Sequence, residues 1–226
     1  MPLRPRITES IDRADPRTVD GLGHLGVATV HEAYSRTGLM HHLSPVTCGA
    51  AVAGSAVTCL NFAGDNLMIH AALEVCQPGD MLVVGVTSPS VHGMFGELLA
   101  TSCKAHGLVG VVLDAGVRDV QPIREMGFPV WSRAISASGT EKALPGWGNT
   151  PISCGGVVVF PGDVVIADDD GIVVVERLDA DEVLERSTKR VEREDSLRPR
   201  FMDGELGLDI SGLRTRLESC ERVTHG

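Results

Sequence analysis

The sequence predicts a mixed α/β sandwich folded as a single domain, and three observations support this. Helix-forming segments alternate with short β-rich segments in no strict order, which favours a sheet of mixed connectivity covered by helices. The length of 226 residues suffices for one sizeable core. Neither a low-complexity linker nor a shift in composition divides the chain. We therefore expect one domain over residues 1–226, whose last part, from about residue 179, forms a charged helical arm.

Local patterns predict the individual elements. Apolar periodicity with capping signals indicates helices, and short apolar runs bounded by turn residues indicate strands. The predicted elements are, in chain order, helices over 10–25 and 29–35, a strand over 52–60, a helix over 64–74, a strand over 81–86, a helix over 98–105, strands over 108–113, 164–167 and 172–176, and helices over 179–193 and 213–222.

Particular residues define some of these boundaries. Thr29 and Glu32 have the spacing of a capping box, and Asp65 or Asn66 would cap the helix that follows them. Asn66 is also a candidate to reach a substrate pocket. The motif Pro-Gly-Asp occurs before two predicted strands, within 77–80 and 160–163, where it predicts type II turns.

Three successive carboxylates at 168–170 precede Gly171 between two β-rich runs. They allow two interpretations, a metal site or an acidic hairpin turn. The spacing is not that of an EF-hand loop, which favours the turn.

The stretch over residues 92–119 is the centre of the functional argument. Gly96 allows an irregular entry to the helix that Glu97 begins, and residues 114–116 (Asp-Ala-Gly) are expected to form a turn that delivers Arg118 and Asp119. A helix of about ten residues rises about 15 Å, and a strand of about six residues covers about 20 Å. A strand that returns antiparallel to the helix would therefore end near the start of that helix.

This geometry predicts one mouth that contains Glu97, Arg118 and Asp119, with the free N–H groups of Leu98 and Leu99 directed into it. Two carboxylates, a guanidinium group and a helix N-terminus suit a hard cation and a carboxylate ligand. The structural alternative is a capping glutamate beside an Arg–Asp pair on the surface.

These residues also resemble a known family. GELLA…DAGVRD, in which Glu97 is followed after twenty residues by Arg118 and Asp119, resembles the acidic-X20-Arg-Asp signature of the class II 4-hydroxy-4-methyl-2-oxoglutarate/4-carboxy-4-hydroxy-2-oxoadipate aldolases. The resemblance continues through VATVHEA, GDN, FPVWSRAIS, PGDVVIADDDG and LGLD, at 27–33, 64–66, 128–136, 161–171 and 206–209. It implies the phosphohistidine-swivelling-domain-like fold of the regulator of ribonuclease activity A proteins, which lack the acidic residue at the position of Glu97.

The resemblance implies roles for the residues. Asp119 would bind Mg²⁺ or Mn²⁺ directly and Glu97 would bind it through water, while Arg118 would contact the pyruvyl group. The substrate carboxylate would meet the start of the helix at three positions, Gly96, Leu98 and Leu99. The implied reaction cleaves a 4-hydroxy-2-oxo acid to pyruvate plus pyruvate or oxaloacetate through a pyruvate enolate, with oxaloacetate decarboxylation as a side activity.

Glu194 falls at the position of a glutamate that, in related enzymes, reaches the waters of the metal from a neighbouring subunit. The resemblance therefore implies self-association as a trimer or hexamer. Glu192 and Asp195 are alternatives for this role, and a solvated charged helix is the structural interpretation of the whole segment.

The chemistry and the function each have alternatives. Lys104, Lys142 and Lys189 lack the apolar surroundings that an imine-forming lysine needs, so a metal-stabilised enolate is better supported than an imine. A non-catalytic regulator that binds a protein partner would not need Glu97. A phosphohistidine carrier would need an exposed histidine, for which His92 is the candidate.

Composition excludes several classes of partner. The net charge of −10 argues against nucleic acid and anionic membranes. The first residues lack the apolar segment of a signal peptide, and no run has the length of a membrane span. The six cysteines are scattered without metal-binding spacing, which favours free thiols and a cytoplasmic protein.

Overall fold

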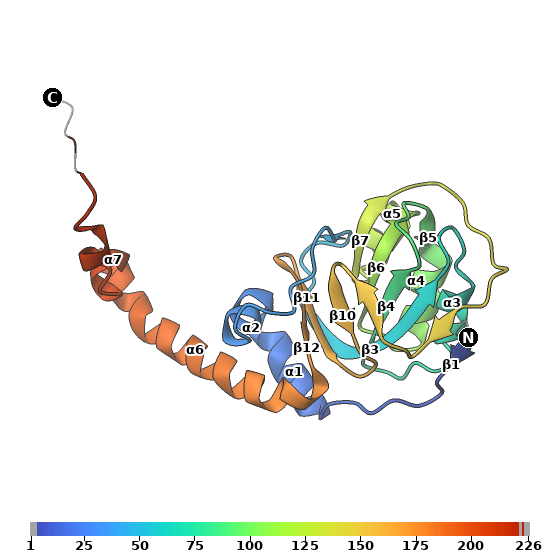
Figure 1. Cartoon of the computed structure of the whole chain (residues 1–226), viewed down its shortest axis with the longest axis horizontal. Coiled ribbons are helices and arrows are strands. Elements are labelled where there is room, and N and C mark those ends of the chain that lie inside the picture. The colour runs from blue at the N-terminus through green and yellow to red at the C-terminus, as the bar shows by residue number, and fades with distance from the viewer. Residues whose placement is uncertain (1–3, 222, 224–226) are drawn as a thin grey trace. The chain divides into compact units, whose positions relative to one another are not determined.

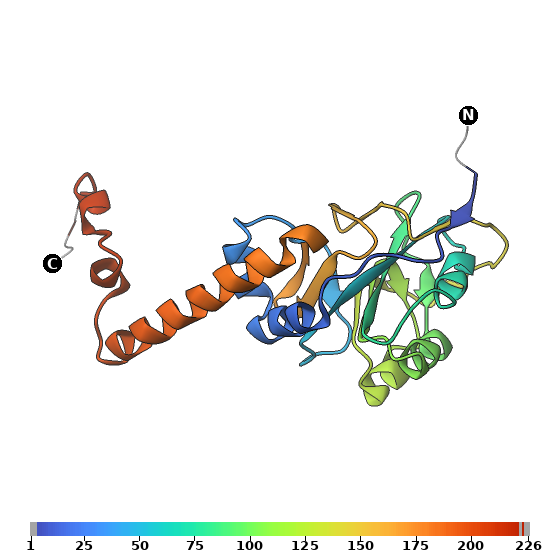
Figure 2. The same cartoon turned by 90° about the horizontal axis from the view of Figure 1, so that it is seen from below.

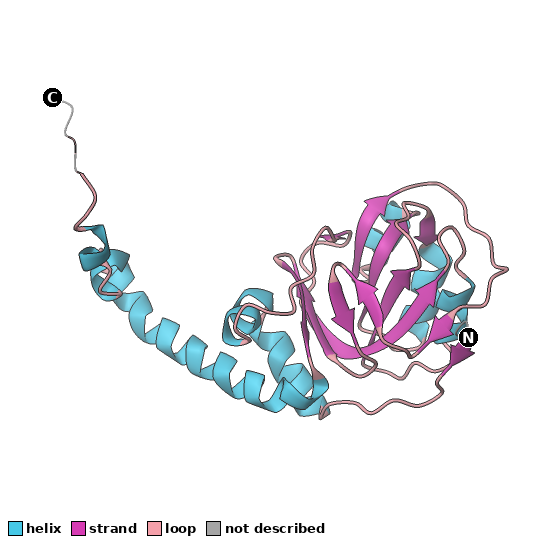
Figure 3. Cartoon of the chain, viewed as in Figure 1, coloured by secondary structure: helices cyan, strands magenta, loops and turns pink. Residues whose placement is uncertain are grey.

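The computed structural model describes residues 4–221 and residue 223. It divides into two compact units, residues 1–187 and residues 188–226. In the described residues, the first unit contains one ten-stranded sheet, one two-stranded sheet and several helices (Figure 1). The strands and the helices that cover them are distinguished in Figure 3. The predicted mixed α/β class is therefore confirmed.

The elements have the following bounds. The described helices are α1 (Pro16–Leu25), α2 (Val27–Ala33), α3 (Leu67–Ala72), α4 (Glu97–Ala105), α5 (Val120–Met126), α6 (Ala180–Met202) and α7 (Gly207–Ile210), with 3₁₀ turns η1 (Arg177–Asp179) and η2 (Arg214–Leu217). The described strands are β1 (Arg6–Ile7), β2 (Ser44–Pro45), β3 (Val52–Asn61), β4 (Asp80–Val86), β5 (Gly93–Phe95), β6 (Gly110–Val117), β7 (Val130–Ile135), β8 (Trp147–Gly148), β9 (Ile152–Cys154), β10 (Val157–Val159), β11 (Val164–Asp168) and β12 (Gly171–Val175).

The centre of the large sheet is parallel. Strands β3, β4, β6 and β7 lie side by side in this order, each parallel to the next. Their apolar runs are buried on both faces, as expected for parallel strands covered on both sides. The antiparallel pair of β11 and β12 extends the sheet from β3, and β5 pairs in parallel with the end of β6.

Alternate residues of the central strands pack into two cores on opposite faces of the sheet. Leu82 and Val84 of β4 belong to the core beneath α3, α4 and α5, while Met81 and Val83 face β9, β10 and β11. Figure 2 shows α4 and α5 together on one face of the sheet. A third core joins α1 and α2 to β11 and β12.

Several predicted boundaries are wrong for identifiable reasons. Helix α1 begins at Pro16 instead of residue 10, because Asp15 caps it by accepting the N–H of Arg17 at 2.8 Å and proline favours the first helical position. Helix α2 begins at Val27, whose N–H is accepted by Asp168 at 2.8 Å, so the proposed capping box does not start this helix.

The predicted turn at 114–116 is also wrong, because these residues continue β6 to Val117. The pairing of β6 with β7 is irregular between Leu113 and Gly116, and a Cβ atom at Gly116 would lie 2.4 Å from the carbonyl oxygen of Val91. Asp-Ala-Gly therefore marks an irregular strand with a close backbone approach.

Three predicted helices differ in length. Helix α3 is shorter than the predicted 64–74, and α6 runs beyond residue 193 to Met202, through Pro199. The predicted helix over 213–222 is reduced to η2, and residue 222 lies outside the described residues. That the arm packs on neighbouring subunits stays a prediction.

The two Pro-Gly-Asp turns share one construction. Gly79 and Gly162 have φ angles of 91° and 89°, as the third position of a type II turn requires. In each turn the aspartate accepts the N–H three residues earlier, Asp80 from Gln77 at 2.7 Å and Asp163 from Phe160 at 2.8 Å. The prediction that both Pro-Gly-Asp motifs form type II turns is confirmed.

The cysteines are free thiols. Burial raises the pKa of Cys59, Cys76 and Cys103 to about 12, so these thiols stay protonated at neutral pH. Within residues 4–221 and 223, none of the helices has the length and apolar character that a membrane crossing requires.

Candidate functional site

The site is built where β5 leads into α4. Gly96 joins the two elements in an extended conformation that any residue can adopt. A Cβ atom at this position would nevertheless lie 2.6 Å from Oδ2 of Asp119 and 3.2 Å from Nε of Arg118. A side chain here would therefore displace the Asp119 carboxylate and the Arg118 guanidinium group, whereas the backbone conformation itself does not need glycine.

Arg118 and Asp119 follow the last residue of β6. The N–H of Arg118 bonds to the carbonyl of Phe95 at 2.8 Å, which continues the pairing between β5 and β6 and fixes the position of this loop against α4. Asp119 then adopts the left-handed conformation, with φ 53° and ψ 41°. Aspartate tolerates this conformation better than most residues, but it still costs about 1 kcal/mol or more.

The carboxylate of Asp119 does not cap α5, the helix that it precedes. Its Oδ2 atom instead lies 3.3 Å from the backbone nitrogen of Glu97 and 3.6 Å from Nε of Arg118. The side chains of Arg118 and Asp119 are 46% and 48% exposed, so their ion pair adds less than about 1 kcal/mol to stability. Both groups are accessible to a ligand.

Glu97 is the first residue of α4 and is half-buried. Its Oε1 atom accepts a hydrogen bond from the hydroxyl of Thr101, one turn later, at 2.9 Å. This bond restricts the rotamer of the glutamate without neutralising its charge. Arg118 and Asp119 thus lie at the start of α4, as predicted, with the backbone of Glu97 beside Asp119. The Glu97 carboxylate instead bonds to Thr101, and Glu97 does not line the cavity that contains Arg118 and Asp119.

The start of α4 contributes backbone donors. The N–H of Ala100 bonds to the carbonyl of Gly96 at 3.0 Å, whereas the N–H groups of Leu98 and Leu99 precede the regular pattern of helical bonds. The Leu98 side chain is 81% exposed and that of Leu99 is buried. Both residues line the same cavity as Arg118 and Asp119.

Asn66 lines this cavity from the start of α3. Its side chain is buried and makes no cap bond to α3, because Asp65 accepts the N–H of Leu67 instead, at 2.9 Å. Nδ2 of Asn66 donates to the carbonyl of Met94 at 2.8 Å, which fixes the orientation of the amide. The Oδ1 atom has no hydrogen-bond partner among the described residues. A buried acceptor without a partner at a cavity indicates that a bound ligand donates a hydrogen bond to it.

Two further titratable residues line the cavity and were not predicted as site residues from the sequence. Lys142 lies in the polar segment between β7 and β8, and His70 lies one turn after Asn66 on α3. Burial lowers the pKa of His70, and the charge of Lys142 lowers it further. No periodicity or motif marks Lys142 in SGTEKALP, so sequence alone had no signal for it.

The cavity is small, about 110 Å³ in volume. Sites for drug-sized ligands span roughly 300 to 1,000 Å³, so this cavity suits a small acid. Its charged lining groups are Arg118, Asp119 and Lys142, and the backbone nitrogen of Glu97 lies 3.3 Å from the Asp119 carboxylate. The positive charges of Arg118 and Lys142 attract an acid to this cavity, although the chain as a whole is negative.

The residues fit a hard divalent cation held by few protein ligands. Asp119 presents an exposed carboxylate, and its Oδ2 atom lies 3.3 Å from the first nitrogen of α4. No group of three or more His, Cys, Asp or Glu side chains that could hold a metal occurs in the described part of the chain. Mg²⁺ commonly binds through one or two carboxylates and keeps several waters, so this donor set is compatible with it.

The acidic run at 168–170, the other candidate metal site, has a structural role. Asp168 accepts the N–H groups of Val27 and Asp170, both at 2.8 Å, and Asp169 accepts that of Gly49 at 2.9 Å. The acidic hairpin interpretation is therefore confirmed by the pairing of β11 with β12. His92 is exposed, its Nδ1 atom lies 3.1 Å from the hydroxyl of Ser90, and it does not line the cavity.

Glu194 belongs to the second unit, on α6. Its Oε1 atom lies 2.9 Å from Nε of Arg190, one turn earlier on the same helix. Asp195 pairs with Arg198 at 3.1 Å, and Glu192 is exposed. The role of Glu194 in a neighbouring site stays a prediction.

Comparison with known proteins places the chain in a family. The RraA-like family model, described as Aldolase/RraA, matches residues 27–174. A relative from Halalkalibacterium halodurans named "Putative 4-hydroxy-4-methyl-2-oxoglutarate aldolase" is 30% identical over 182 residues, which are 80% of this chain and 84% of the relative.

Two solved structures show the same fold. Streptomyces coelicolor RraAS2, described as an unusual member of the RNase ES inhibitor RraA protein family, has a TM-score of 0.77 and 30% identity, covering 84% of this chain and 99% of its own. The RNA-processing inhibitor RraA from Thermus thermophilis has a TM-score of 0.59 and 26% identity, covering 66% and 90%. The chain described here, with its acidic residue, arginine and aspartate gathered at the start of α4, is a member of the RraA-like (Aldolase/RraA) family.

Proposed function

We propose that this protein is a divalent-metal-dependent aldolase that cleaves a 4-hydroxy-2-oxo dicarboxylate or tricarboxylate to pyruvate. The candidate substrates are 4-hydroxy-4-methyl-2-oxoglutarate and 4-carboxy-4-hydroxy-2-oxoadipate. One observation carries the proposal: the Asp119 carboxylate, the Arg118 guanidinium group and the start of α4 meet at one small cavity. The aldolase name of the relative with 30% identity supports it.

The pyruvyl half of the substrate would bind at the start of α4. The N–H groups of Leu98 and Leu99 would donate to its carboxylate, in the favourable field of the helix N-terminus. Arg118 would donate to the oxygen atoms of the pyruvyl group with its planar guanidinium. Arg118 is about half exposed, so it can bind the substrate without losing a buried structural contact.

A divalent cation, Mg²⁺ or Mn²⁺, would be held by Asp119 directly and by Glu97 through water, and it would stabilise negative charge on the 2-oxo group as a Lewis acid. The protein residues would orient the substrate around this charge. Arg118 stabilises the developing enolate, and the Thr101 hydroxyl holds Glu97 in place.

The distal half of the substrate would meet Asn66 and Lys142. The unpartnered Oδ1 atom of Asn66 would accept a hydrogen bond from the 4-hydroxyl group. The Lys142 ammonium group would bind the distal carboxylate. In the cleavage step the 4-hydroxyl turns its proton from Asn66 to a water molecule held by the acidic groups and loses it to that water. The hydroxyl oxygen then becomes a carbonyl as the C3–C4 bond breaks, and the electron pair of that bond forms the pyruvate enolate. Protonation of the enolate at C3 then gives pyruvate.

The test is release of pyruvate from the two candidate substrates, measured on chelated protein with and without added Mg²⁺ or Mn²⁺. We expect activity that disappears on chelation and returns with either cation. Full activity after exhaustive chelation, or inactivation by borohydride in the presence of pyruvate, would contradict the proposal and favour a lysine imine. Oxaloacetate decarboxylation is the expected side activity, because it passes through the same enolate.

The alternative function is a non-catalytic regulator that binds a protein partner, and the likeness to the two RraA structures supports it. Such a protein would not need the charge of Glu97. The replacement Glu97→Gln keeps an oxygen that can accept from Thr101, so the fold should persist. An aldolase should lose much of its turnover, whereas an unchanged kcat would favour the regulator.

A further inference from the structure

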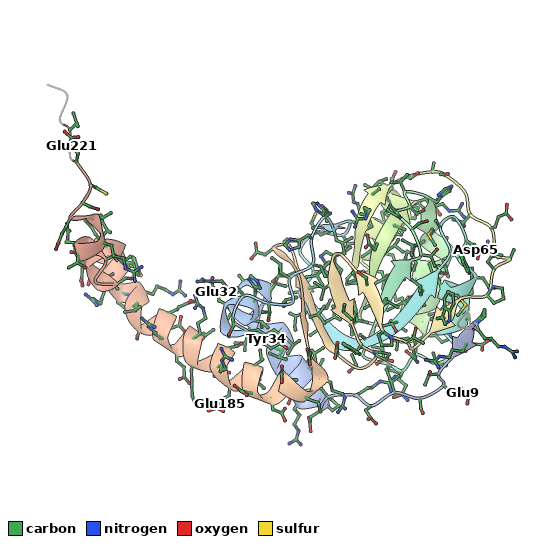
Figure 4. All side chains as sticks on the ribbon, in the orientation of Figure 1. Glu9, Glu32, Tyr34, Asp65, Glu185 and Glu221 are labelled. Atoms are coloured by element: carbon green, nitrogen blue, oxygen red, sulfur yellow. The ribbon has the colours of Figure 1, made fainter. Side chains whose placement is uncertain are left out.

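The carboxylate of Asp65 is buried, 3% exposed, and accepts three backbone hydrogen bonds. Oδ1 accepts from the N–H of Leu67 at 2.9 Å, and Oδ2 accepts from the N–H groups of Ala143 and Leu144 at 2.7 and 3.0 Å. One side chain therefore joins the start of α3 to a segment 78 residues later in the chain. Figure 4 labels Asp65 on the side of the sheet where the long loop between β7 and β8 passes.

Backbone pairing holds the same segment from its other side. The N–H of Asn66 bonds to the carbonyl of Glu141 at 3.0 Å, and the N–H of Glu141 bonds to the carbonyl of Gly64 at 2.9 Å. Lys142 is thus bracketed, with residue 141 fixed by the backbone of 64–66 and residue 143 fixed by the Asp65 carboxylate. Residues 141–145 are otherwise exposed and, apart from a single β-bridge at Glu141, have no regular secondary structure.

The negative charge of Asp65 strengthens its hydrogen bonds to the backbone. Burial alone would raise its pKa, but the three backbone N–H donors and the charge of Lys142 together lower it. The group is therefore ionised at neutral pH, and a carboxylate forms stronger bonds to backbone N–H groups than a neutral acceptor does.

We propose that Asp65 is a positioning residue that holds Lys142 and Asn66 at a fixed separation in the cavity, so that they receive the distal carboxylate and the 4-hydroxyl of the substrate; this rests on the proposed function. Asn66 follows Asp65 directly in the chain, and Lys142 precedes the two amides that Asp65 binds. The Asp65 bonds therefore restrain the backbone next to both cavity residues, in addition to the pairing of Asn66 with Glu141.

A purely structural role for Asp65, as the cap of α3, makes a different prediction. Asp15 offers a matched control, because it caps α1 with the same bond, from its carboxylate to the N–H two residues later, at 2.8 Å. Asp15 does not line the cavity. Loss of either cap should lower stability. The loss of Asp65 should also change how the protein treats its substrates.

The experiment compares two reactions of one protein. Cleavage of 4-hydroxy-4-methyl-2-oxoglutarate needs the distal carboxylate to bind, whereas exchange of the C3 protons of pyruvate with solvent does not. We measure kcat/KM for both in the native protein and in the variants Lys142→Met, Asp65→Ala and the double variant, with Asp15→Ala and Lys104→Met as controls. Lys104→Met removes the same charge at a residue outside the cavity, which donates to the carbonyl of Met126.

We expect Lys142→Met and Asp65→Ala each to lower cleavage about tenfold more than exchange, as for the loss of a charge-assisted hydrogen bond. The double variant should lose less in this ratio than the product of the two single losses, because both changes remove the Lys142 contact. Lys142→Arg should restore part of the ratio. The controls should leave the ratio unchanged.

Two outcomes would overturn the proposal: an Asp65→Ala variant that is less stable but has the native ratio, or losses that add in the double variant. If Asp65→Ala does not fold, Asp65→Asn replaces it, with hydrogen exchange of the Ala143 and Leu144 amides as the added measurement. Faster exchange of these amides with a native ratio would equally overturn it. Failure of the proposed function is distinct, because the native protein itself would then catalyse neither reaction.

Discussion

The Oδ2 atom of Asp119 lies 3.3 Å from the backbone nitrogen of Glu97, although 22 residues separate the two along the chain. This contact joins the loop after β6 to the start of α4. It places a carboxylate, a guanidinium group and free backbone donors around one cavity. The left-handed conformation of Asp119 aims its side chain toward α4 instead of along α5.

A side chain at Gly96 would separate these groups, because its Cβ atom would lie 2.6 Å from Oδ2 of Asp119. We expect Gly96→Ala to fold but to lose about hundredfold or more in kcat/KM, since misplacement by about 1 Å has effects of that size. Gly139→Ala is the control, because a Cβ atom there meets nothing within 4 Å. Thermal unfolding and pyruvate release measure both variants, and a fully active Gly96→Ala would refute the proposed geometry.

The replacement Arg118→Lys keeps the charge but removes the planar pair of donors. We expect a loss of about hundredfold or more in pyruvate release, similar to the removal of a donor that stabilises an oxyanion. Arg17→Lys, at an exposed position on α1, should retain native activity. A lysine variant with at least half of the native kcat/KM would show that Arg118 acts only through its charge.

The pKa of Asp65 predicts a difference in acid stability. Burial raises this pKa, and the backbone donors and Lys142 lower it by more, so that it falls below the ordinary value of 3.8. The stabilisation that it contributes is complete above about pH 4 and is lost as the pH falls through the folded-state pKa. The free energy of unfolding measured in urea should differ between the native protein and Asp65→Ala by a constant amount from pH 5 to 8, and by a smaller amount at pH 3. The same difference at pH 3 and pH 7 would contradict this assignment.

The proposed trimer or hexamer predicts active sites completed between subunits. Glu194 lies on α6, where it pairs with Arg190, and we propose that it reaches the site of a neighbouring subunit. Asp119→Ala and Glu194→Ala should each be inactive, while a mixture after subunit exchange should regain activity at interfaces that combine an intact Asp119 with an intact Glu194. The same exchange with Glu192→Ala or Asp195→Ala in place of Glu194→Ala tests the two neighbouring carboxylates.

The result depends on proof that subunits exchange, for example by mass spectrometry of labelled protein. Exchange without recovery of activity would exclude Glu194 from the neighbouring site. A fully active monomer would exclude the shared site altogether.

Much of the central motif was predictable from the sequence, because it depends on local rules. The run from Leu98 to Ala105 is helix-forming, and the following apolar run is strand-forming, so simple rises per residue brought Arg118 and Asp119 back to Glu97. The type II turns at Gly79 and Gly162 were predictable for the same reason.

The predictions that were wrong or missing concern features that depend on contacts between distant residues. Asp168 caps α2 from 141 residues away, which no local capping pattern indicates. Residues 114–116 have the composition of a turn, but the pairing of Gly116 with β5 and β7 carries the strand past them. Lys142 lines the cavity next to Ala143, whose N–H donates to Asp65, and that long-range bond leaves no periodic signal in the sequence.

The proposal that this protein forms a pyruvate enolate with a divalent cation is tested most directly by exchange of the methyl protons of pyruvate for deuterium in D₂O, followed by ¹H NMR. Exchange reports formation of the enolate without requiring the identity of the full substrate. We expect exchange by the native protein with Mg²⁺, loss of exchange on chelation, recovery when Mg²⁺ is restored, and no exchange by Asp119→Asn under any of these conditions. Exchange that continues at the full rate after exhaustive chelation, or that is absent with Mg²⁺ present, would contradict it.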